Sequence, residues 1–268
     1  TKKYYAIRDK MSEWVKLPEY PVEDTKKVDF GTAEFKETAS LWSNLGALDP
    51  SPVVAEHPMT MEKLDLDYGF ILYRTVVKKG GKVRIEDVHD RAYVYVNQRY
   101  FGLIERANVA ATVEIEAKEG DSLDILLESL GRLNYGGQMK DPKGILGDVY
   151  LDDEVLLHWT MYRLGMKDLS HLQWVEAKEK AVGPAFYRSF VEIAEPADTF
   201  VNPKGWTKGH IYANGVNLGR FWTVGPQLTL YCPAPLLKSG TNEFVAFEIS
   251  GSESLTMTLD DHHQIDIL

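Results

Sequence analysis

From residue 68 onward, the chain alternates hydrophobic and polar positions, or forms short apolar runs that glycine, aspartate, asparagine and lysine interrupt. Such alternation is typical of half-buried β-strands. Because no helical pattern stands between the runs, the chain is predicted to be all-β, as an antiparallel sandwich or barrel. The runs are FILYRTVV, KVRIEDV, AYVYVN, ATVEIEA, SLDILLES and DVYLDDEVLLHWTMYRL.

The first residues carry the one helical pattern, which ends at Leu17-Pro18 because proline disfavours helix at the residue before it. A short amphipathic helix must bury its apolar stripe, either on the β-domain behind it or on a partner outside this chain. In the second case the stripe should not be buried within the chain. The stripe could then pack on a second copy of the chain, so a homodimer is one of the expected arrangements. The stripe consists of Tyr4, Ile7, Met11, Trp14 and Val15.

Between the helix and the β-rich part, prolines surround one strand-like run, KVDFGTAEFKETASLW. Residues 1–58 are therefore interpreted as a terminal helix followed by a linker that contains one strand. The prolines are Pro18, Pro21, Pro50, Pro52 and Pro58.

Two similar β-hairpins raise the possibility of a duplicated domain. Residues 211–222 read IYANGVNLGRFW, in which Asn214-Gly215 suits a tight type I′ turn. Residues 94–106 read VYVNQRYFGLIER, with a similar order of strand, polar turn and strand. The hairpin alone would be weak evidence, so further correspondences are needed.

Other signals recur in the same order at a nearly constant offset. LYRT at 72–75 is echoed by FYRS at 186–189, and GDSLDILLE at 120–128 by GTNEFVAFE at 240–248. The sequence therefore predicts two related β-domains. Their boundaries are placed at residues 59–165 and 180–268, with a connector at 166–179.

Composition narrows the class of protein. Hydrophobic residues make up 44% of the 268 residues and charged residues 26%, which is typical of a packed globular chain. The net charge of −10 disfavours nucleic acid and anionic membranes as partners, since both require a basic surface. Cys232 is the only cysteine, so no intrachain disulfide can form, and a reducing, cytoplasmic compartment is expected. No apolar run is long enough to span a membrane.

The chain begins at Thr1 and its first residues resemble neither a signal peptide nor a transit peptide, so we expect it to be a piece of a longer protein. It shows no serine nucleophile elbow, no HExxH motif and no phosphate-binding glycine loop. Acidic pairs such as Asp152-Asp153 and Asp260-Asp261 stand in apparent turns, where solvated carboxylates are usual. Neither a metal site nor a cofactor is predicted.

Several segments together resemble the C-terminal half of family-35 glycoside hydrolases, the β-galactosidases. They are DYGFILYRT, DRAYVYVN, LLESLGRLNYG, KGILGDVYLD and GWTKGHIYANGVNLGRFWTVGPQLTLYCPAPLLKSGTNEFVAFE. The resemblance implies two consecutive jelly-roll β-sandwich domains of galactose-binding-like fold, and TKKYYAIRD resembles the helix that ends the catalytic barrel of that family.

The resemblance also implies where the chemistry lies. The two catalytic glutamates of such enzymes stand on an N-terminal (β/α)8 barrel, so this chain contains no catalytic residue and is predicted to be inactive alone. Its expected role is to buttress that barrel, and its expected ligand is a β-galactoside. The alternative is a free-standing, lectin-like carbohydrate-binding module.

Candidate sugar-binding residues follow from the chemistry of sugars, whose apolar faces stack on aromatic rings while amides and charges bind their hydroxyl groups. The loop LGRLNYGGQMKDPKG, residues 130–144, offers Arg132, Asn134 and Tyr135 beside two glycines. It is either a structural connection or a loop that reaches a sugar site with Tyr135 as the platform. In the resembled family, loops of the first jelly roll lie against the barrel mouth, which favours the second interpretation.

Trp206 and Trp222 flank the second hairpin and are predicted to lie near one end of a sheet. They are either a carbohydrate platform or half-buried contacts of the core or of the domain interface. Arg74 and Arg188 follow matched tyrosines in both repeats, which favours a structural pairing of each with a carboxylate. Trp159 is predicted to belong to the core.

Overall fold

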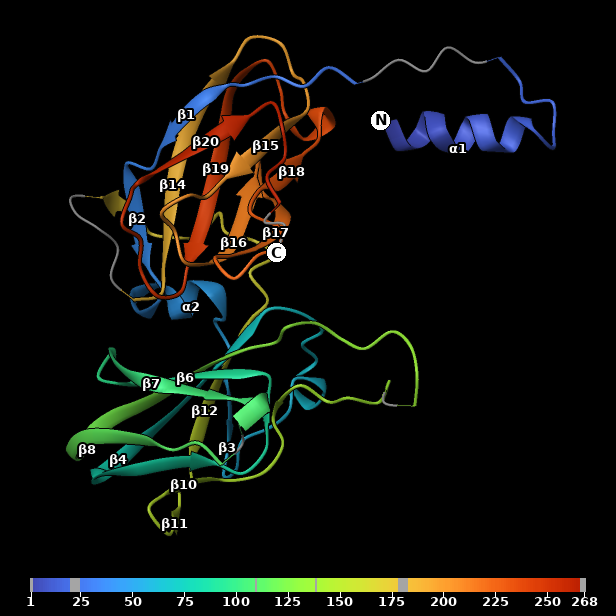
Figure 1. Ribbon diagram of the computed structural model, residues 1–268. Helices are drawn as coiled ribbons and strands as arrows, with labels where there is room; N and C mark the ends of the chain where they lie inside the picture. The colour runs from blue at the N-terminus through green and yellow to red at the C-terminus, as the bar shows by residue number, and fades with distance from the viewer. Residues whose placement is uncertain (1, 20–24, 109, 138, 178–182, 266–268) are drawn as a thin grey trace.

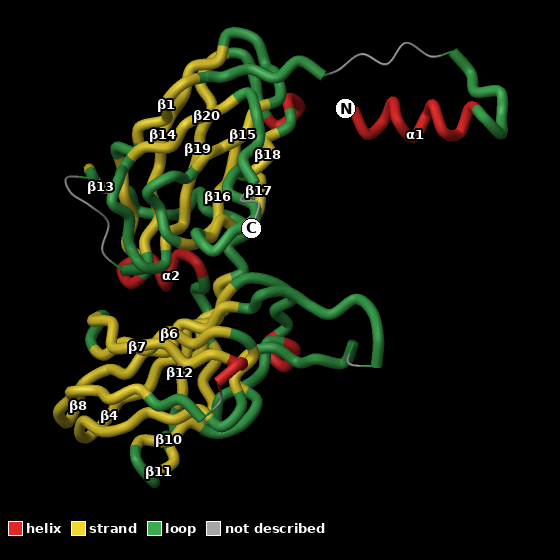
Figure 2. Tube along the Cα trace, viewed as in Figure 1, coloured by secondary structure: helices red, strands yellow, loops and turns green. Residues whose placement is uncertain are grey.

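Figure 1 shows the computed structural model of the chain, which describes residues 2–19, 25–108, 110–137, 139–177 and 183–265. Two β-rich domains lie one above the other, and a short helix stands apart from both (Figure 2). The prediction of an all-β chain with a short N-terminal helix is confirmed. Within the described residues, no helix is long and apolar enough to cross a lipid bilayer.

The first domain is built on a twisted sheet in the order β11-β10-β4-β8-β6-β7, with β12 beside β4 and β3 beside β12. A small β5-β9 pair lies beside this sheet. Its strands are β3 (Val53–Ala55), β4 (Phe70–Ile85), β5 (Val88–His89), β6 (Arg91–Val96), β7 (Arg99–Glu105), β8 (Val113–Glu128), β9 (Gly144–Ile145), β10 (Val149–Leu151), β11 (Glu154–Val155) and β12 (Trp159–Leu164). Trp159 and Tyr73 are fully buried in its core, as the sequence predicts for Trp159.

The second domain packs a sheet in the order β13-β2-β14-β19-β16-β17 against a smaller sheet in the order β1-β20-β15-β18. Its core contains Trp206, Phe221 and Phe244. Its strands are β1 (Gly31–Glu34), β2 (Glu37–Ser40), β13 (Val175–Glu176), β14 (Ala185–Ile193), β15 (Thr199–Asn202), β16 (Lys208–Ala213), β17 (Val216–Trp222), β18 (Leu230–Cys232), β19 (Gly240–Glu248) and β20 (Thr256–Asp260). The helices of the chain are α1 (Lys2–Ser12) and α2 (Leu45–Leu48), with 3-10 turns at Trp42–Asn44, Glu62–Leu64, Arg106–Asn108 and Ala234–Leu236.

The segment interpreted as a linker with one strand differs from that interpretation. It contains three strands: β3 pairs with β12 of the first domain, and β1 and β2 complete the second domain, where Ala33 of β1 pairs with Met257 and Ala39 of β2 pairs with Phe186. Both alanines are buried, so the segment supplies core residues rather than a solvated connection. Residues 20–24 of the linker and residues 178 and 179 of the connector lie outside the described residues.

The two predicted hairpins are present as β6-β7 and β16-β17. Asn214 and Gly215 have φ of 48° and 82°, and the corresponding Asn97 and Gln98 have φ of 47° and 69°. Positive φ at both central residues is the property of a type I′ turn. Each hairpin also shifts its strand register once, after Val94 in the first and after Ile211 in the second. The two domains therefore share this irregularity at corresponding positions.

The matched arginines have the structural role that the sequence predicts. Arg74 Nε lies 2.6 Å from the Asp124 carboxylate, which is buried. Arg188 Nε lies 2.8 Å from Glu37, and a second nitrogen lies 3.4 Å from Glu243. Each arginine therefore pairs with a carboxylate of a neighbouring strand.

The two domains share a continuous apolar interface. Phe70, Tyr93 and Leu126 of the first domain belong to one buried cluster with Phe186 and Phe247 of the second. Such an interface holds the domains in one relative orientation, since separating them would expose large aromatic side chains to water.

Polar contacts cross the same interface. The Tyr68 hydroxyl lies 3.0 Å from Nδ1 of His210 and accepts a hydrogen bond of 2.8 Å from the Asn217 amide. Burial lowers the pKa of His210 to about 4, so the ring is neutral at pH 7. Lys208 of the second domain donates to Glu128 of the first, and both are buried.

The hydrophobic stripe of α1 is not buried within this chain. Tyr4, Ile7 and Met11 are 39%, 52% and 50% exposed, and Trp14 is 80% exposed. Figure 1 shows α1 away from both domains. The arrangement agrees with the expectation that the stripe belongs to a partner outside the chain.

Candidate functional site

The loop that carries the predicted sugar contacts leaves β8 after Glu128 and returns to the fold at β9. Tyr135 is 91% exposed near its tip, and Asn134 beside it is also exposed. Gly131 and Gly136 have φ of 118° and 95°, so the backbone turns there in a conformation that favours glycine. The loop thus presents an aromatic ring to solvent, away from the core of its domain.

Arg132, the second predicted sugar contact of the loop, makes several hydrogen bonds within the fold. Its guanidinium donates to the carbonyl oxygens of Asp67 at 3.1 Å and Leu66 at 3.4 Å, and to the Glu62 carboxylate. The Glu62 carboxylate also accepts the backbone N–H of Lys143 at 3.1 and 3.2 Å. These contacts use three of the five N–H donors of Arg132 and anchor the loop to the segment before β4.

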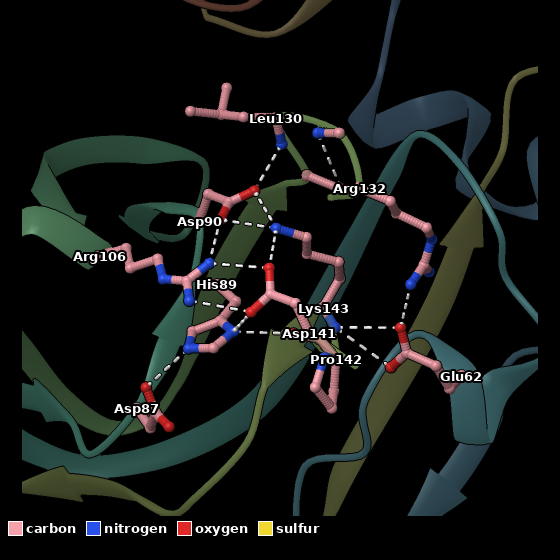
Figure 3. Close-up of polar contacts among 12 residues, drawn as sticks. Glu62, Asp87, His89, Asp90, Arg106, Leu130, Arg132, Asp141, Pro142 and Lys143 are labelled. Atoms are coloured by element: carbon pink, nitrogen blue, oxygen red, sulfur yellow. Dashed lines mark hydrogen bonds and ion pairs between the residues drawn. The ribbon is translucent and has the colours of Figure 1, made fainter. Parts of the chain in front are cut away.

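Below the loop lies a compact cluster of charged residues, drawn in Figure 3. The ammonium of Lys143 lies 3.0 and 3.1 Å from the two Asp90 oxygens and 2.8 Å from Asp141. Arg106 binds Asp141 through two nitrogens, both at 2.9 Å, and lies 3.4 Å from Asp90. His89 Nδ1 lies 3.2 Å from Asp141.

Each carboxylate at the centre of this cluster contacts more than one basic side chain. Asp90, Asp141 and Lys143 are 6%, 9% and 3% exposed, so each charge needs a partner because water is excluded. The Arg106 hydrogen bonds, followed by the effect of Lys143, hold the pKa of Asp141 far below its ordinary value. Asp90 and Asp141 thus each contact both Lys143 and Arg106 beneath the loop.

The end of the loop is fixed by Gly144, whose φ is 107°. A Cβ atom there would lie 2.6 Å from the Tyr73 hydroxyl, so no larger residue fits. That hydroxyl donates to the Met59 carbonyl at 2.7 Å and accepts from the Ile145 N–H at 3.2 Å. The loop therefore returns to the fold at a position with no freedom to shift.

Trp206 and Trp222 line one pocket of about 280 Å³ at the end of the second domain, as expected for residues near one end of a sheet. Trp206 is 1% exposed, packs edge-on against Phe35 and Tyr187, and donates from Nε1 to the Thr256 carbonyl at 2.9 Å. It therefore has no open face on which a sugar could stack. Trp206 therefore covers one end of the hydrophobic core of the second domain.

Trp222 is half-buried and lies at the domain interface. The Lys208 ammonium lies 4.0 Å from the centre of its ring, and the Arg91 guanidinium 4.8 Å. Its indole thus makes cation–π contacts as well as lining the pocket. The residues that line this pocket come from the second domain, so the pocket and the Tyr135 loop are separate candidate sites.

The sequence interpretation did not identify the residues that hold these sites. Asp90, Asp141 and Lys143 stand in polar segments, where a solvated charge is the usual expectation. Glu128 offered a better signal: it directly follows an apolar run and corresponds to Glu248 in the repeat, and both glutamates are buried. A carboxylate that recurs at the end of a hydrophobic strand indicates a buried polar contact.

Two family models match the chain. "Beta-galactosidase, first all-beta domain" matches residues 58–165, and "Beta-galactosidase, galactose-binding domain" matches residues 184–242. These ranges fall on the two β-rich domains, although the sheets of both domains also include strands outside them, such as β3 in the first and β1, β2, β13 and β20 in the second.

Individual relatives agree with these models. A human beta-galactosidase is 35% identical to the chain, in an alignment that covers 93% of this chain and 41% of the relative. A beta-galactosidase of Xanthomonas manihotis is 38% identical, with 86% and 39% covered, and a human beta-galactosidase-1-like protein 2 is 35% identical, with 92% and 41% covered. The chain thus spans about two fifths of the length of these relatives. It belongs to the β-galactosidase family, of which it carries the first all-β domain and the galactose-binding domain.

Proposed function

We propose that this chain is the non-catalytic β region of a β-galactosidase that hydrolyses terminal β-linked galactose. In this proposal it buttresses a catalytic barrel and carries no catalytic residue itself. The relatives' names and the share of their length that the chain spans support the proposal. The exposed stripe of α1 and of the turn after it, from Tyr4 to Trp14, is a suitable contact surface for such a barrel.

The single observation that carries the functional part of the proposal is Tyr135. Tyr135 is 91% exposed on a loop with a buried ionic base, so its ring contributes nothing to the core and both of its faces can meet a ligand. We infer that it lines the mouth of the galactoside pocket. There it would stack on the sugar beyond the cleaved bond.

Replacing Tyr135 with alanine should lower kcat/KM of the full-length enzyme by about tenfold, since a stacked aromatic contributes roughly 0.5–1.5 kcal/mol beyond its buried area. The loss should be larger for a natural disaccharide than for a small synthetic galactoside, because only the disaccharide extends to this loop. Kinetics with both substrates and the melting temperature of each enzyme provide the measurement.

Tyr100→Ala is a matched control. Tyr100 is 52% exposed on β7 of the same domain, so its removal should leave the kinetics with both substrates unchanged. If Tyr135→Ala lowers kcat/KM equally for the two substrates, or lowers the melting temperature of the enzyme strongly, Tyr135 is part of the scaffold only.

The pocket beside Trp222 is the observation on which a second candidate function, that of a free-standing carbohydrate-binding module, would rest. Its volume of about 280 Å³ is near the lower end of ligand pockets, and Trp206 offers no open face. Calorimetric titration of this chain with galactose, lactose and larger β-galactosides is therefore expected to show no binding tighter than millimolar. Tighter binding that Trp222→Ala abolishes would support the module instead of the buttress.

A further inference from the structure

We propose that Asp90, Asp141 and Lys143 form a clamp that fixes the position of Tyr135 and are therefore positioning residues for the reaction of the whole enzyme. This inference rests on the proposed function, because it requires Tyr135 to contact the substrate. None of the three residues is expected to touch the sugar, since all are buried beneath the loop.

The Asp90 carboxylate holds both ends of the loop. Its Oδ2 accepts the backbone N–H of Leu130 at 2.7 Å, where the loop begins. The same carboxylate receives the ammonium of Lys143, where the loop ends, at 3.0 and 3.1 Å. Figure 3 shows these two contacts converging on Asp90. The exposed residues between them therefore leave the domain and return to it at one point.

A second layer ties the end of the loop to the adjacent strands. Arg106 binds Asp141 through two nitrogens and donates its backbone N–H to the Asp90 carbonyl at 2.8 Å. His89 Nδ1 lies 2.8 Å from the Pro142 carbonyl oxygen, and its Nε2 lies 3.1 Å from Asp87. His89 at the end of β5, Asp90 after it and Arg106 after β7 thus hold residues 141–143.

The arrangement fits a positioning role better than a purely stabilising one. The described loop residues from Leu130 to Lys140 are all exposed, so the cluster supports a segment that adds nothing to the hydrophobic core. A loop with free ends would sample many positions, and placing its ring against a substrate would cost conformational entropy. A buried clamp removes that cost by holding the loop in place before the substrate arrives.

Lys143→Met tests the clamp, because methionine has similar length but removes the ammonium that Asp90 and Asp141 share. In the full-length enzyme we expect kcat/KM to fall by about tenfold for a natural disaccharide, mainly through KM, and by less for a small synthetic galactoside. In the Tyr135→Ala background, the same substitution should have little further effect. Two changes that act through one contact are not additive.

Arg74→Met is the matched control. It removes the cation partner of the buried Asp124 in the same domain, away from the loop. It should lower the melting temperature in a similar way but change kcat/KM equally, or not at all, for the two substrates. If Lys143→Met does not fold, Asp90→Asn takes its place in the same cycle, since it keeps the shape of the side chain and removes its charge.

The outcomes separate the two proposals. If Tyr135→Ala lowers kcat/KM equally for both substrates, the proposed role of the loop is wrong. The proposed role of the clamp is then wrong as well. When Tyr135→Ala behaves as expected, the loss of kcat/KM in Lys143→Met can still be the same for both substrates, or add fully to that of Tyr135→Ala in the double variant. In that case only the clamp is overturned. A loss that depends on the substrate and disappears in the Tyr135→Ala background supports both.

Discussion

Replacing Lys208 with methionine should lower the free energy of unfolding of this chain by about 3–5 kcal/mol, the usual effect of breaking a buried ion pair. Lys208 is 3% exposed and Glu128 is 1% exposed, and they meet across the domain interface. Oε1 of Glu128 has no hydrogen-bond partner among the described residues. Without Lys208, the Tyr93 hydroxyl, at 3.3 Å from Oε2, would be the one side-chain hydrogen-bond donor left to this carboxylate among the described residues. Chemical denaturation of the two proteins measures the difference.

The pair itself contributes less than this loss indicates. Burial lowers the pKa of Lys208 to about 8, although the Glu128 carboxylate acts in the opposite direction, so removal from water outweighs the attraction. Replacing both residues with methionine should therefore recover most of the stability. A double variant as unstable as Lys208→Met would contradict this account.

An exposed ion pair provides the control. Lys79 and Asp152 lie 2.9 Å apart with side chains 53% and 40% exposed. Lys79→Met should leave the free energy of unfolding almost unchanged, because water screens and solvates both charges. If Lys79→Met lowers the free energy of unfolding as much as Lys208→Met does, burial does not determine how much an ion pair contributes to stability.

The strands and hairpins of this protein could be predicted because their signals are local. Asn214-Gly215 selects the turn of β16-β17 through the φ angles that these residues allow, and the flanking alternation defines the strands. The repeat added information that a single domain lacks. It predicted the carboxylate partners of Arg74 and Arg188 without identifying them.

The assignment of β1 and β2 to the second domain could not be predicted in the same way. Ala33 pairs with Met257 across almost the whole chain, and nothing within a short window of sequence specifies such a partner. Prolines on both sides of this segment are typical of linkers, and that local signal was stronger than the buried alanines. The same limit applies to Lys208, whose partner Glu128 lies in the other domain.

The candidate site was predictable to a similar extent. The glycines around Tyr135 indicated an exposed loop, and the structure places the tyrosine in solvent. The sequence could not show that Arg132 is engaged, because two of its acceptors are backbone carbonyls of residues 66 and 67. Trp206 was ambiguous because an indole suits a core lid and a sugar platform equally well, and only the packing of Phe35 and Tyr187 decides between them.

Gly209→Ala should destabilise the second domain by more than about 4 kcal/mol, a loss seen only where a substitution has a specific structural cause. Gly209 lies on β16 between β19 and β17, opposite Glu248 and Phe221. A Cβ atom there would overlap the Phe247 carbonyl oxygen and lie 2.8 Å from its carbonyl carbon. Because the obstacle is backbone and not a flexible side chain, the methyl group fits only if β16 and β19 separate.

Separation of these strands would also reach the domain interface, since Lys208 directly precedes Gly209 and would move away from Glu128. Gly46→Ala is the control: Gly46 lies in α2, and nothing stands within 4 Å of its Cβ position. Alanine favours helix over glycine by about 1 kcal/mol, so Gly46→Ala should be neutral or slightly stabilising. Thermal unfolding followed by circular dichroism compares the variants. An unchanged melting temperature in Gly209→Ala would mean that β19 can shift without loss of the sheet, and that close contact of strands at Gly209 does not hold the interface together.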